Sequence, residues 1–493
     1  MIMKDTTAPF TPLLVDGEFR PSLSDKSFEV RNPYTNLVVG HAASASSEDC
    51  KDAIETAGKA FATWEHSPFE QRRSILLRAA DLLETDRYKE KIINAVRDET
   101  ATAEHMLQFN TNSPAAALRD AACLVGELKG ESFPSQIPGG HVVTQRRAMG
   151  VIFAVSPWNA PMLLSVRAVA VPIVCGNTVV FKCSEVTPRT QSIVAEVLFE
   201  AGLPRGVLNF LSMDKQDAPS LTSEIIAHPL IRKINFTGSD RVGRLLAAEA
   251  AKYLKPCVFE LGGKAPVLVL DDADTEQAAR AIVSSAVMNS GQICMSTERV
   301  IVQRKASDTL IPAIVKHMSA VTAGDYRTSP HIISALFTEQ SAASLVGMIT
   351  EAESEGATVL VGNKQREGAV VKPHVLLNVK PGMRMWDRET FGPVMAIAVA
   401  DTVDEIVELA NASDYTLVAG LWTKDLSTAL NVAGRVRSGW TNINGPSVHL
   451  EAMRGHCGLG GATGYGHFDI ENFTDVRMIV IHPTGPTQYP LVG

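Results

Sequence analysis

Residues 150–155 decide the fold, and they read Gly-Val-Ile-Phe-Ala-Val. Similar β-rich runs follow at 178–182, 207–211 and 231–236, at intervals of roughly 25 to 30 residues, with helix-period windows between them. Strands that alternate with helices in this way form βαβ units, whose strands are parallel. The pattern therefore predicts an α/β protein with a mostly parallel sheet. Such sheets bind ligands at the carboxyl ends of their strands.

The flanking segments extend the pattern in both directions. The apolar spacing from about residue 50 to 127 predicts several amphipathic helices, and a second α/β stretch begins near 266–270. Residues 130–145 are rich in Gly, Pro and Ser and predict a turn followed by an extended segment. The extended run 475–482 and the Pro-rich end 483–493 look too thin to bury themselves, because an isolated ribbon is marginal in water. We expect these ribbons to pair with another subunit.

Composition excludes several classes of function. The 493 residues exceed the size of a single core, so two or more domains are expected. Hydrophobic residues make up 45% and charged residues 20%, as in an ordinary soluble enzyme. The net charge of −8 gives no indication of a positively charged surface that would bind nucleic acid. The sequence shows neither a signal peptide nor an apolar stretch long enough to cross a membrane, so we expect a cytoplasmic protein with a small-molecule partner.

Cysteine and histidine spacing argues against a metal centre. The seven cysteines are dispersed from Cys50 to Cys457 without a C-x-x-C pair, so neither a disulfide framework nor a zinc site is predicted. His449, His456 and His467 have no fixed ligand spacing, and they read as a set of solvated loop residues. We therefore expect no bound metal.

Cys294 is the candidate nucleophile and Glu260 the candidate base. Cys294 lies among small and polar residues after a helical window, where its thiol could face a ligand. A lone cysteine is, however, more often a small buried hydrophobe. Glu260 ends a β-rich run just before Gly262 and Gly263, where its carboxylate could activate a water molecule. A solvated loop glutamate is the alternative at that position.

Other strand ends carry polar groups suited to ligand binding. Asn159 lies between two prolines after a strand, and its amide could donate to an oxyanion or form an Asx turn. Lys182 and Glu185 close a second strand. Residues 236–239 close a third strand and open a helix, whose N-terminus offers donors for a phosphate. No G-x-G-x-x-G sequence follows a strand, so the usual dinucleotide fingerprint is missing.

Taken in order, these segments resemble the NAD(P)-dependent aldehyde dehydrogenase superfamily over nearly the whole chain. The matching segments are 157–159 (oxyanion), 182–185 (adenosine ribose), 236–239 (pyrophosphate), 259–266 (general base), 291–299 (nucleophile) and 389–393 (nicotinamide ribose). The resemblance implies a Rossmann-type NAD-binding domain of residues 1–127 and 149–260 and an α/β catalytic domain of residues 261–455. It also implies an oligomerisation arm with a C-terminal segment, formed by residues 128–148 and 456–493.

The resemblance implies a role for each of these residues. The Cys294 thiolate attacks an aldehyde, while the Asn159 amide and the Cys294 N–H hold the oxyanion. Hydride transfer then leaves a thioester, and Glu260 activates the water that hydrolyses it to the acid. The implied cofactor-binding residues are Trp158, Lys182, Glu185, Gly238, Ser239, Leu261, Gly262, Glu389 and Phe391. A carboxylate at 185 accepts a ribose 2′-hydroxyl and repels a 2′-phosphate, so NAD is expected rather than NADP.

Within the superfamily, residues 293–299 and 463–466 look most like the salicylaldehyde, benzaldehyde and vanillin dehydrogenase branch, so we expect an aromatic aldehyde. The implied substrate-pocket residues are Leu163, Leu164, Arg167, Ile293 and Met295, with Arg167 as a cation for a phenolic or acid-bearing ring. Rival hypotheses are an enzyme for aliphatic or biosynthetic aldehydes and a non-catalytic structural or binding relative. Residues 446–464 depart from the family's pattern and leave the exact aldehyde open. The expected assembly is a homodimer or a dimer of dimers.

Overall fold

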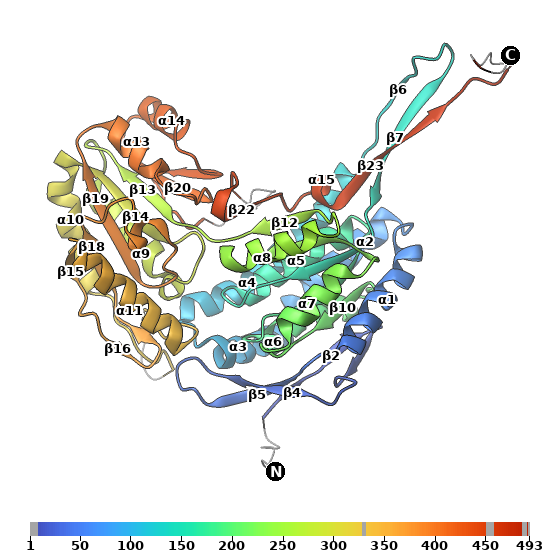
Figure 1. The fold of residues 1–493 in the computed structure, drawn as a ribbon, viewed down its shortest axis with the longest axis horizontal. Helices are drawn as coiled ribbons and strands as arrows, with labels where there is room; N and C mark the ends of the chain where they lie inside the picture. The colour runs from blue at the N-terminus through green and yellow to red at the C-terminus, as the bar shows by residue number, and fades with distance from the viewer. Residues whose placement is uncertain (1–7, 328–331, 450–457, 486–490, 492–493) are drawn as a thin grey trace.

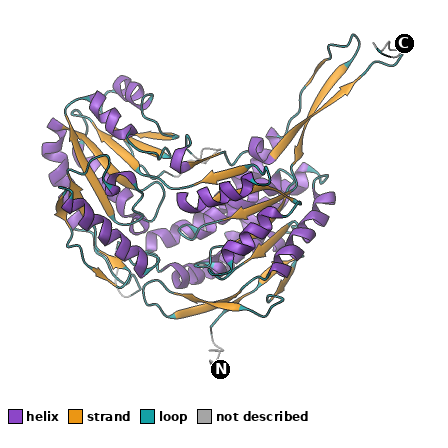
Figure 2. Cartoon of the chain, in the orientation of Figure 1, coloured by secondary structure: helices purple, strands orange, loops and turns teal. Residues whose placement is uncertain are grey.

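The computed structural model describes residues 8–327, 332–449, 458–485 and 491. The chain forms two α/β lobes, and a β arm projects from the first lobe (Figures 1 and 2). Within the described residues, no helix is both long enough and apolar enough to cross a membrane.

The first lobe is built on an eight-stranded sheet with the order β22-β12-β11-β8-β9-β10-β2-β3. Its parallel centre consists of β12 (Cys257–Glu260), β11 (Ile231–Thr237), β8 (Val151–Val155), β9 (Thr178–Lys182) and β10 (Leu208–Leu211). The antiparallel edges are β22 (Gly464–Tyr465) on one side and β2 (Leu13–Val15) with β3 (Glu18–Arg20) on the other. The four predicted runs are β8 to β11, and the predicted α/β fold is confirmed.

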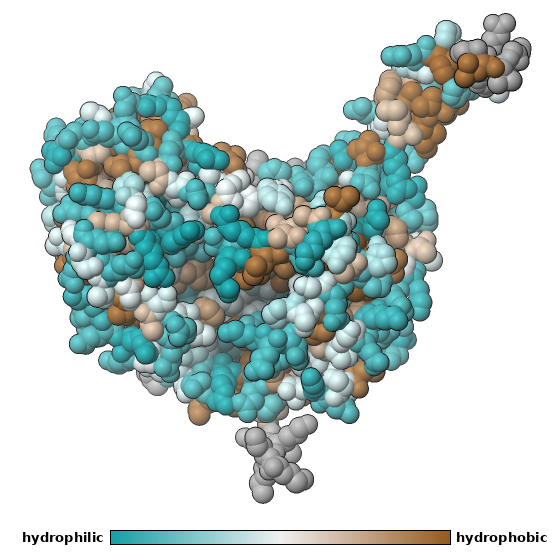
Figure 3. All heavy atoms as spheres, viewed as in Figure 1, coloured by the Kyte–Doolittle hydropathy of each residue, from teal (hydrophilic) through white to brown (hydrophobic). Residues whose placement is uncertain are grey.

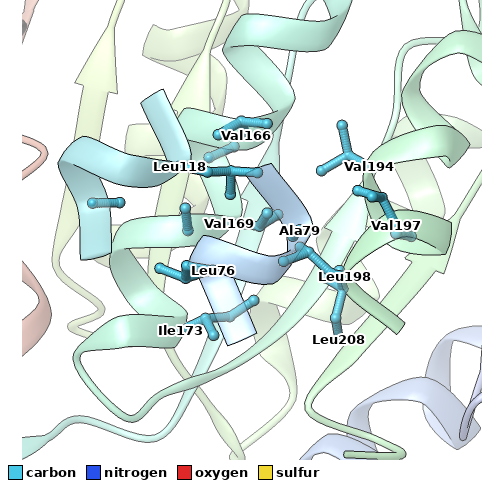
Figure 4. Packing of buried hydrophobic residues seen from close by; sticks show 14 of the residues in the cluster. Leu76, Ala79, Leu118, Val166, Val169, Ile173, Val194, Val197, Leu198 and Leu208 are labelled. Atoms are coloured by element: carbon cyan, nitrogen blue, oxygen red, sulfur yellow. The ribbon is translucent and has the colours of Figure 1, made fainter. Parts of the chain in front are cut away.

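Both faces of this sheet are buried by helices. Along β8, Ile152 and Ala154 belong to one core while Val151 and Phe153 belong to the other, as the alternation of side chains in a strand requires. The first core, part of which Figure 4 shows, contains residues of α2 (Phe69–Leu83), α3 (Asp86–Thr100), α4 (Glu104–Cys123), α5 (Pro161–Val174) and α6 (Pro188–Glu200). The second contains residues of α1 (Ser47–Trp64), α7 (Ala218–Ala227) and α8 (Asp240–Ala251).

The second lobe is built on a seven-stranded sheet with the order β15-β18-β19-β14-β13-β20-β21. Its parallel strands are β18 (His374–Leu377), β19 (Val394–Ala400), β14 (Thr297–Gln303), β13 (Ala265–Val269), β20 (Val418–Trp422) and β21 (Trp440–Ile443), and β15 (Thr358–Val361) is an antiparallel edge. The helices are α9 (Thr275–Val287), α10 (Arg304–Ser319), α11 (Glu339–Ser354), α12 (Arg384–Asp387), α13 (Val403–Asn411) and α14 (Leu426–Ala433). A short hairpin joins β16 (Arg366–Glu367) to β17 (Val370–Val371).

The arm is a three-stranded antiparallel sheet with the order β23-β7-β6. Its strands are β6 (Ser132–Pro134), β7 (His141–Ala148) and β23 (Thr474–Ile481), and β23 pairs with β7 along its whole length. Figure 1 shows the arm pointing away from both lobes, and Figure 3 shows apolar side chains on its surface. The helix α15 (Ile470–Phe473) immediately precedes β23 and packs its apolar residues into the first core. A small sheet of β1 (Phe10–Thr11), β5 (Val38–Ala43) and β4 (Ser27–Arg31) lies near the N-terminus.

Residues 261–264 join β12 to β13, and there the chain crosses from the first sheet to the second. The segments that follow β8, β9, β11 and β12 leave the carboxyl ends of parallel strands, so they gather at one edge of the first sheet. Most of the predicted functional residues of the first lobe belong to these segments.

Candidate active site

A cavity of about 1260 Å³ reaches Cys294, Glu260 and Asn159, the three predicted catalytic residues. Both lobes contribute to its wall: α4 and α5 from the first, the 293–295 turn and β21 from the second. All five predicted substrate-pocket residues lie in this wall, namely Leu163, Leu164, Arg167, Ile293 and Met295. The structure therefore brings together residues that are widely separated in the sequence.

Cys294 lies in the turn between α9 and β14 and is half-buried. Burial raises the pKa of its thiol well above the usual value, and the nearby charge of Glu260 raises it further. The thiol is therefore protonated at neutral pH in this state. The turn lies close against Gly263, where a Cβ atom would come within 1.9 Å of the Cys294 carbonyl oxygen. Only glycine allows the two chain segments to approach so closely.

Glu260 is the last residue of β12, and its side chain is only 1% exposed. Its carboxylate forms an ion pair with Arg167 of α5, which compensates a charge that would be costly to bury alone. The same carboxylate lies close enough to the Cys294 thiol to raise its pKa. Arg167 also donates to the hydroxyl of Thr237 over 3.2 Å, and its guanidinium lies 4.4 Å from the ring centroid of Phe468. Arg167 thus lines the cavity, as predicted, but its charge is directed at Glu260.

Asn159 lies in the turn between β8 and α5, with its side chain almost fully buried at the cavity wall. Its Nδ2 donates a hydrogen bond of 3.0 Å to the carbonyl oxygen of Gln292, two residues before the nucleophile. An amide nitrogen carries two hydrogens, so a second donor remains for a group in the cavity. The amide is therefore held beside the thiol.

The predicted cofactor residues of the first lobe follow neighbouring strands. Lys182 ends β9 and is buried, with its ammonium donating to the Cys183 carbonyl over 2.9 Å, and Glu185 follows in the next turn. Gly238 and Ser239 follow β11, and the Ser239 hydroxyl accepts from the Val242 N–H and caps α8. This edge thus presents a cation, a carboxylate and a helix N-terminus, a set that suits the ribose and pyrophosphate of a dinucleotide.

The remaining predicted cofactor residues meet where the lobes join. The Glu389 carboxylate accepts the Gly263 N–H over 2.8 Å, and burial, followed by the charge of Glu298, raises its pKa to about 8. Gly262 lies against the same carboxylate, and the neighbouring Leu261 is buried. The Trp158 ring contacts Phe391 edge-on at 5.8 Å. The residues expected around a nicotinamide ribose are therefore adjacent.

A buried network of ion pairs and hydrogen bonds holds the segment that follows Glu389. Glu298 forms an ion pair with Lys264 and accepts hydrogen bonds from the Thr390 N–H at 2.9 Å and the Thr390 hydroxyl at 2.6 Å. Arg299 donates to the Lys264 carbonyl over 3.0 Å, and its guanidinium lies 5.0 Å from the Trp386 ring centroid. The start of β14, which follows the nucleophile turn, therefore also anchors the residues that follow Glu389.

Sequence reasoning missed several residues of the site. Phe337 stacks on Trp158 with ring centroids 4.5 Å apart, and Asn289 and Gln292 contact Asn159. Trp440 and His449 stack at 4.6 Å and both line the cavity, so the interpretation of His449 as a solvated loop residue is wrong. The contacts of Trp158 and Asn159 join segments far apart in the sequence, which periodicity does not detect.

The predicted histidine set does not form a ligand cluster where the structure describes it. His449 packs against Trp440, His467 is half-buried, and His456 lies outside the described residues. Across the described ranges, no three His, Cys, Asp or Glu side chains are grouped so that they could hold a metal ion.

Replacing Glu260 by glutamine tests the electrostatics of the thiol. A neighbouring anion disfavours the thiolate, so Glu260→Gln should lower the pKa of Cys294, and the charge of Arg167, no longer facing a carboxylate, should act in the same direction. The measurement is the pH dependence of Cys294 alkylation by iodoacetamide, followed by peptide mass spectrometry. Exposed Glu90→Gln is the control and should leave the profile unchanged. A profile displaced to higher pH would contradict this description of the site.

Comparisons with known proteins agree with this arrangement. The model of the aldehyde dehydrogenase family matches residues 19–479. The chain is 41% identical to a vanillin dehydrogenase of Pseudomonas sp. (strain HR199 / DSM 7063) and 37% identical to a salicylaldehyde dehydrogenase of Pseudomonas sp. (strain C18), and both alignments cover 97% of this chain and 99% of the relative. The solved salicylaldehyde dehydrogenase from Pseudomonas putida G7, complexed with salicylaldehyde, aligns with a TM-score of 0.94 at 36% identity, over 98% of this chain and 100% of that one. The chain belongs to the aldehyde dehydrogenase family.

Proposed function

We propose that the protein uses NAD to oxidise an aromatic aldehyde to the carboxylic acid, with a thioester on Cys294 as the intermediate. The observation that carries the proposal is the meeting of Cys294, Glu260 and Asn159 at one largely apolar cavity. The similarity to vanillin, salicylaldehyde and benzaldehyde dehydrogenases supports the aromatic class.

The arrangement suggests how the residues share the chemistry. As the Cys294 sulfur adds to the carbonyl carbon, the carboxylate of Glu260, which lies beside the thiol, takes the thiol proton. The free hydrogen of the Asn159 amide, together with the Cys294 N–H, stabilises the oxyanion that forms. Bound NAD supplies the hydride acceptor that converts the adduct to a thioester. Once Glu260 has released its proton, it takes another from the water that hydrolyses the thioester.

The ion pair with Glu260 suggests a different role for Arg167 than the sequence did. The sequence led us to expect a cation for a phenolic or acid-bearing ring. Because Arg167 is engaged by Glu260 and Thr237, a substrate hydroxyl would have to compete with a buried ion pair. We propose instead that Arg167 orients the Glu260 carboxylate and that the cavity takes an uncharged ring.

The cavity wall favours an aryl group. Trp440 packs with Cys294 and Met295 against the same small apolar cluster, so its ring lies near the nucleophile. Phe109 and Phe468 add further aromatic surface. Aromatic rings gain about 0.5–1.5 kcal/mol by stacking, beyond the burial of their area. The alternative, an aliphatic aldehyde, is favoured by the 33% identity to a lactaldehyde dehydrogenase of Escherichia coli.

The residues at the strand ends fit a dinucleotide, and we propose NAD as the preferred one. Lys182 and Glu185 would hold the adenosine ribose, the N-terminus of α8 the pyrophosphate, and Glu389 the nicotinamide ribose. Glu185 disfavours a 2′-phosphate by charge repulsion. Solved relatives include both NAD-dependent and NADP-dependent enzymes. The proposed preference for NAD therefore depends on the carboxylate of Glu185.

We further propose that the arm pairs two copies of the chain, giving a homodimer or a dimer of dimers. The strand β23 lies at the edge of its sheet, and apolar side chains along it are exposed, including Val476 at 60% and Met478 at 63%. An unpaired apolar edge of this length invites association. In this arrangement the arm strands within residues 128–148 and 456–493 serve assembly. Residues 1–127 and 149–260 bind the cofactor, and residues 261–455 carry the nucleophile. The six described cysteines are free, which suits the reducing cytoplasm.

Steady-state turnover across aryl and alkyl aldehydes tests the proposed activity. Purified protein with NAD should oxidise benzaldehyde-type substrates with a kcat/KM at least about tenfold above that for short alkyl aldehydes, about 1.4 kcal/mol of differential binding. Cys294→Ala should abolish turnover of both classes. A preference for alkyl aldehydes would support the alternative, and no turnover of any aldehyde would contradict the proposal.

Replacing Glu185 by glutamine tests the cofactor assignment. The wild type should have a higher kcat/KM with NAD than with NADP. Glu185→Gln should reduce the ratio of these two kcat/KM values by about tenfold, because repulsion of the 2′-phosphate is removed. Exposed Glu90→Gln changes the net charge equally and should leave the ratio as it is. An unaltered ratio in Glu185→Gln would show that other residues select the cofactor.

A further inference from the structure

We propose that Asn289 is a positioning residue that holds the oxyanion-binding amide of Asn159 in place. The inference rests on the proposed function and adds a residue to it. Three amide side chains form a closed cycle of hydrogen bonds around the nucleophile turn. Asn289 Nδ2 donates to the Asn159 carbonyl at 3.1 Å, Asn159 Nδ2 to the Gln292 carbonyl at 3.0 Å, and Gln292 Nε2 to the Asn289 carbonyl at 3.0 Å.

The backbone of the turn is strained at the residue that starts the cycle. Asn289 has φ 51°, Ser290 has φ 58° and Gly291 has φ 76°, so three consecutive residues are left-handed. A left-handed conformation at a non-glycine residue is strained and persists only where surrounding contacts enforce it. A Cβ atom on Gly291 would come within 2.1 Å of the Gly392 carbonyl oxygen, so the turn is pressed against the segment after Glu389.

Specific contacts from outside the turn enforce this conformation. The Thr102 hydroxyl donates to Asn289 Oδ1 over 2.8 Å, so both polar atoms of the Asn289 side chain are satisfied. Ser290 Oγ donates to the Ser334 carbonyl at 3.1 Å and accepts the Ser334 N–H at 3.0 Å. The side chains of Asn289 and Ser290 are almost fully buried. Thr102 and Asn159 belong to the first lobe and Asn289 to the second, so the cycle also ties the lobes together.

The cycle fixes Asn159 at two points, its own carbonyl oxygen and its side-chain amide. Stabilising an oxyanion requires a donor at hydrogen-bond distance from the developing charge, and a misplacement of about 1 Å costs on the order of 100-fold in rate. Without Asn289, the backbone of residue 159 loses its anchor on the nucleophile turn. The Asn159 amide would then no longer be held at hydrogen-bond distance from the oxyanion. Formation of the tetrahedral adduct would therefore be slower.

The test uses Asn289→Gly, which removes both side-chain bonds while glycine still adopts a positive φ. The first burst of NADH from an aldehyde that the wild type oxidises should slow by about ten- to hundredfold, with the KM for NAD unchanged. Alkylation of Cys294 by iodoacetamide is a displacement without an oxyanion, so its rate should stay within about twofold of the wild type. A merely structural defect would slow both reactions, and that outcome would overturn the proposal.

Further variants keep the test independent of folding. Thr102→Val deletes only the hydroxyl that holds Asn289 and should slow the burst by about threefold. Asn209→Ala removes another buried amide that bridges two backbone groups, in β10, and should leave the burst unchanged. In a protein that already carries Asn159→Ala, adding Asn289→Gly should slow the burst by less than about twofold further, because the two residues act together.

The possible outcomes separate the two proposals. If the wild type oxidises no aldehyde, the proposed function fails. If the wild type turns over and Asn289→Gly shows a wild-type burst, the proposed function stands and the role of Asn289 is refuted. Full additivity of Asn289→Gly with Asn159→Ala would also refute that role.

Discussion

The site depends on one constraint, a carboxylate almost fully removed from water at the end of β12. Glu260 is held there by the guanidinium of Arg167, and its charge acts on the nearby Cys294 thiol. Burying an unpaired carboxylate costs on the order of several kcal/mol, and the ion pair with Arg167 offsets that cost. Burial and the charge of Glu260 together raise the pKa of the Cys294 thiol and favour its protonated form.

The second constraint is that no single lobe contains the whole site. Asn159, Arg167 and Glu260 come from the first sheet's side, whereas Cys294 and Glu389 come from the second. Two sets of hydrogen bonds join them: the buried amide cycle at the nucleophile turn and the partly buried bond from the Gly263 N–H to Glu389. Because these contacts involve residues proposed to bind substrate and cofactor, small displacements between the lobes would disturb both at once.

The sequence predicted those features of the fold and the site that depend on local patterns of residues. The spacing of the β-rich runs predicted β8 to β11, and the polar residues after those strands lie together because parallel strands share a carboxyl edge. Pairings across the chain were not predictable. Asn289 contacts Asn159 from 130 residues away, and Thr102 lies 187 residues from Asn289. Arg167 lines the cavity as the sequence predicted, but its ion pair with Glu260 was not predicted. A helical pattern indicates on which face of the helix a side chain lies, but it does not identify the charged group that the side chain contacts.

The central claim is that Cys294 carries the acyl group and that Glu260 activates the water that releases it. The most direct test is mass spectrometry of Glu260→Gln protein mixed with NAD and an aldehyde that the wild type oxidises. The account predicts one NADH per chain and an acyl group retained on the peptide that contains Cys294. Continued turnover without a retained acyl group would contradict it.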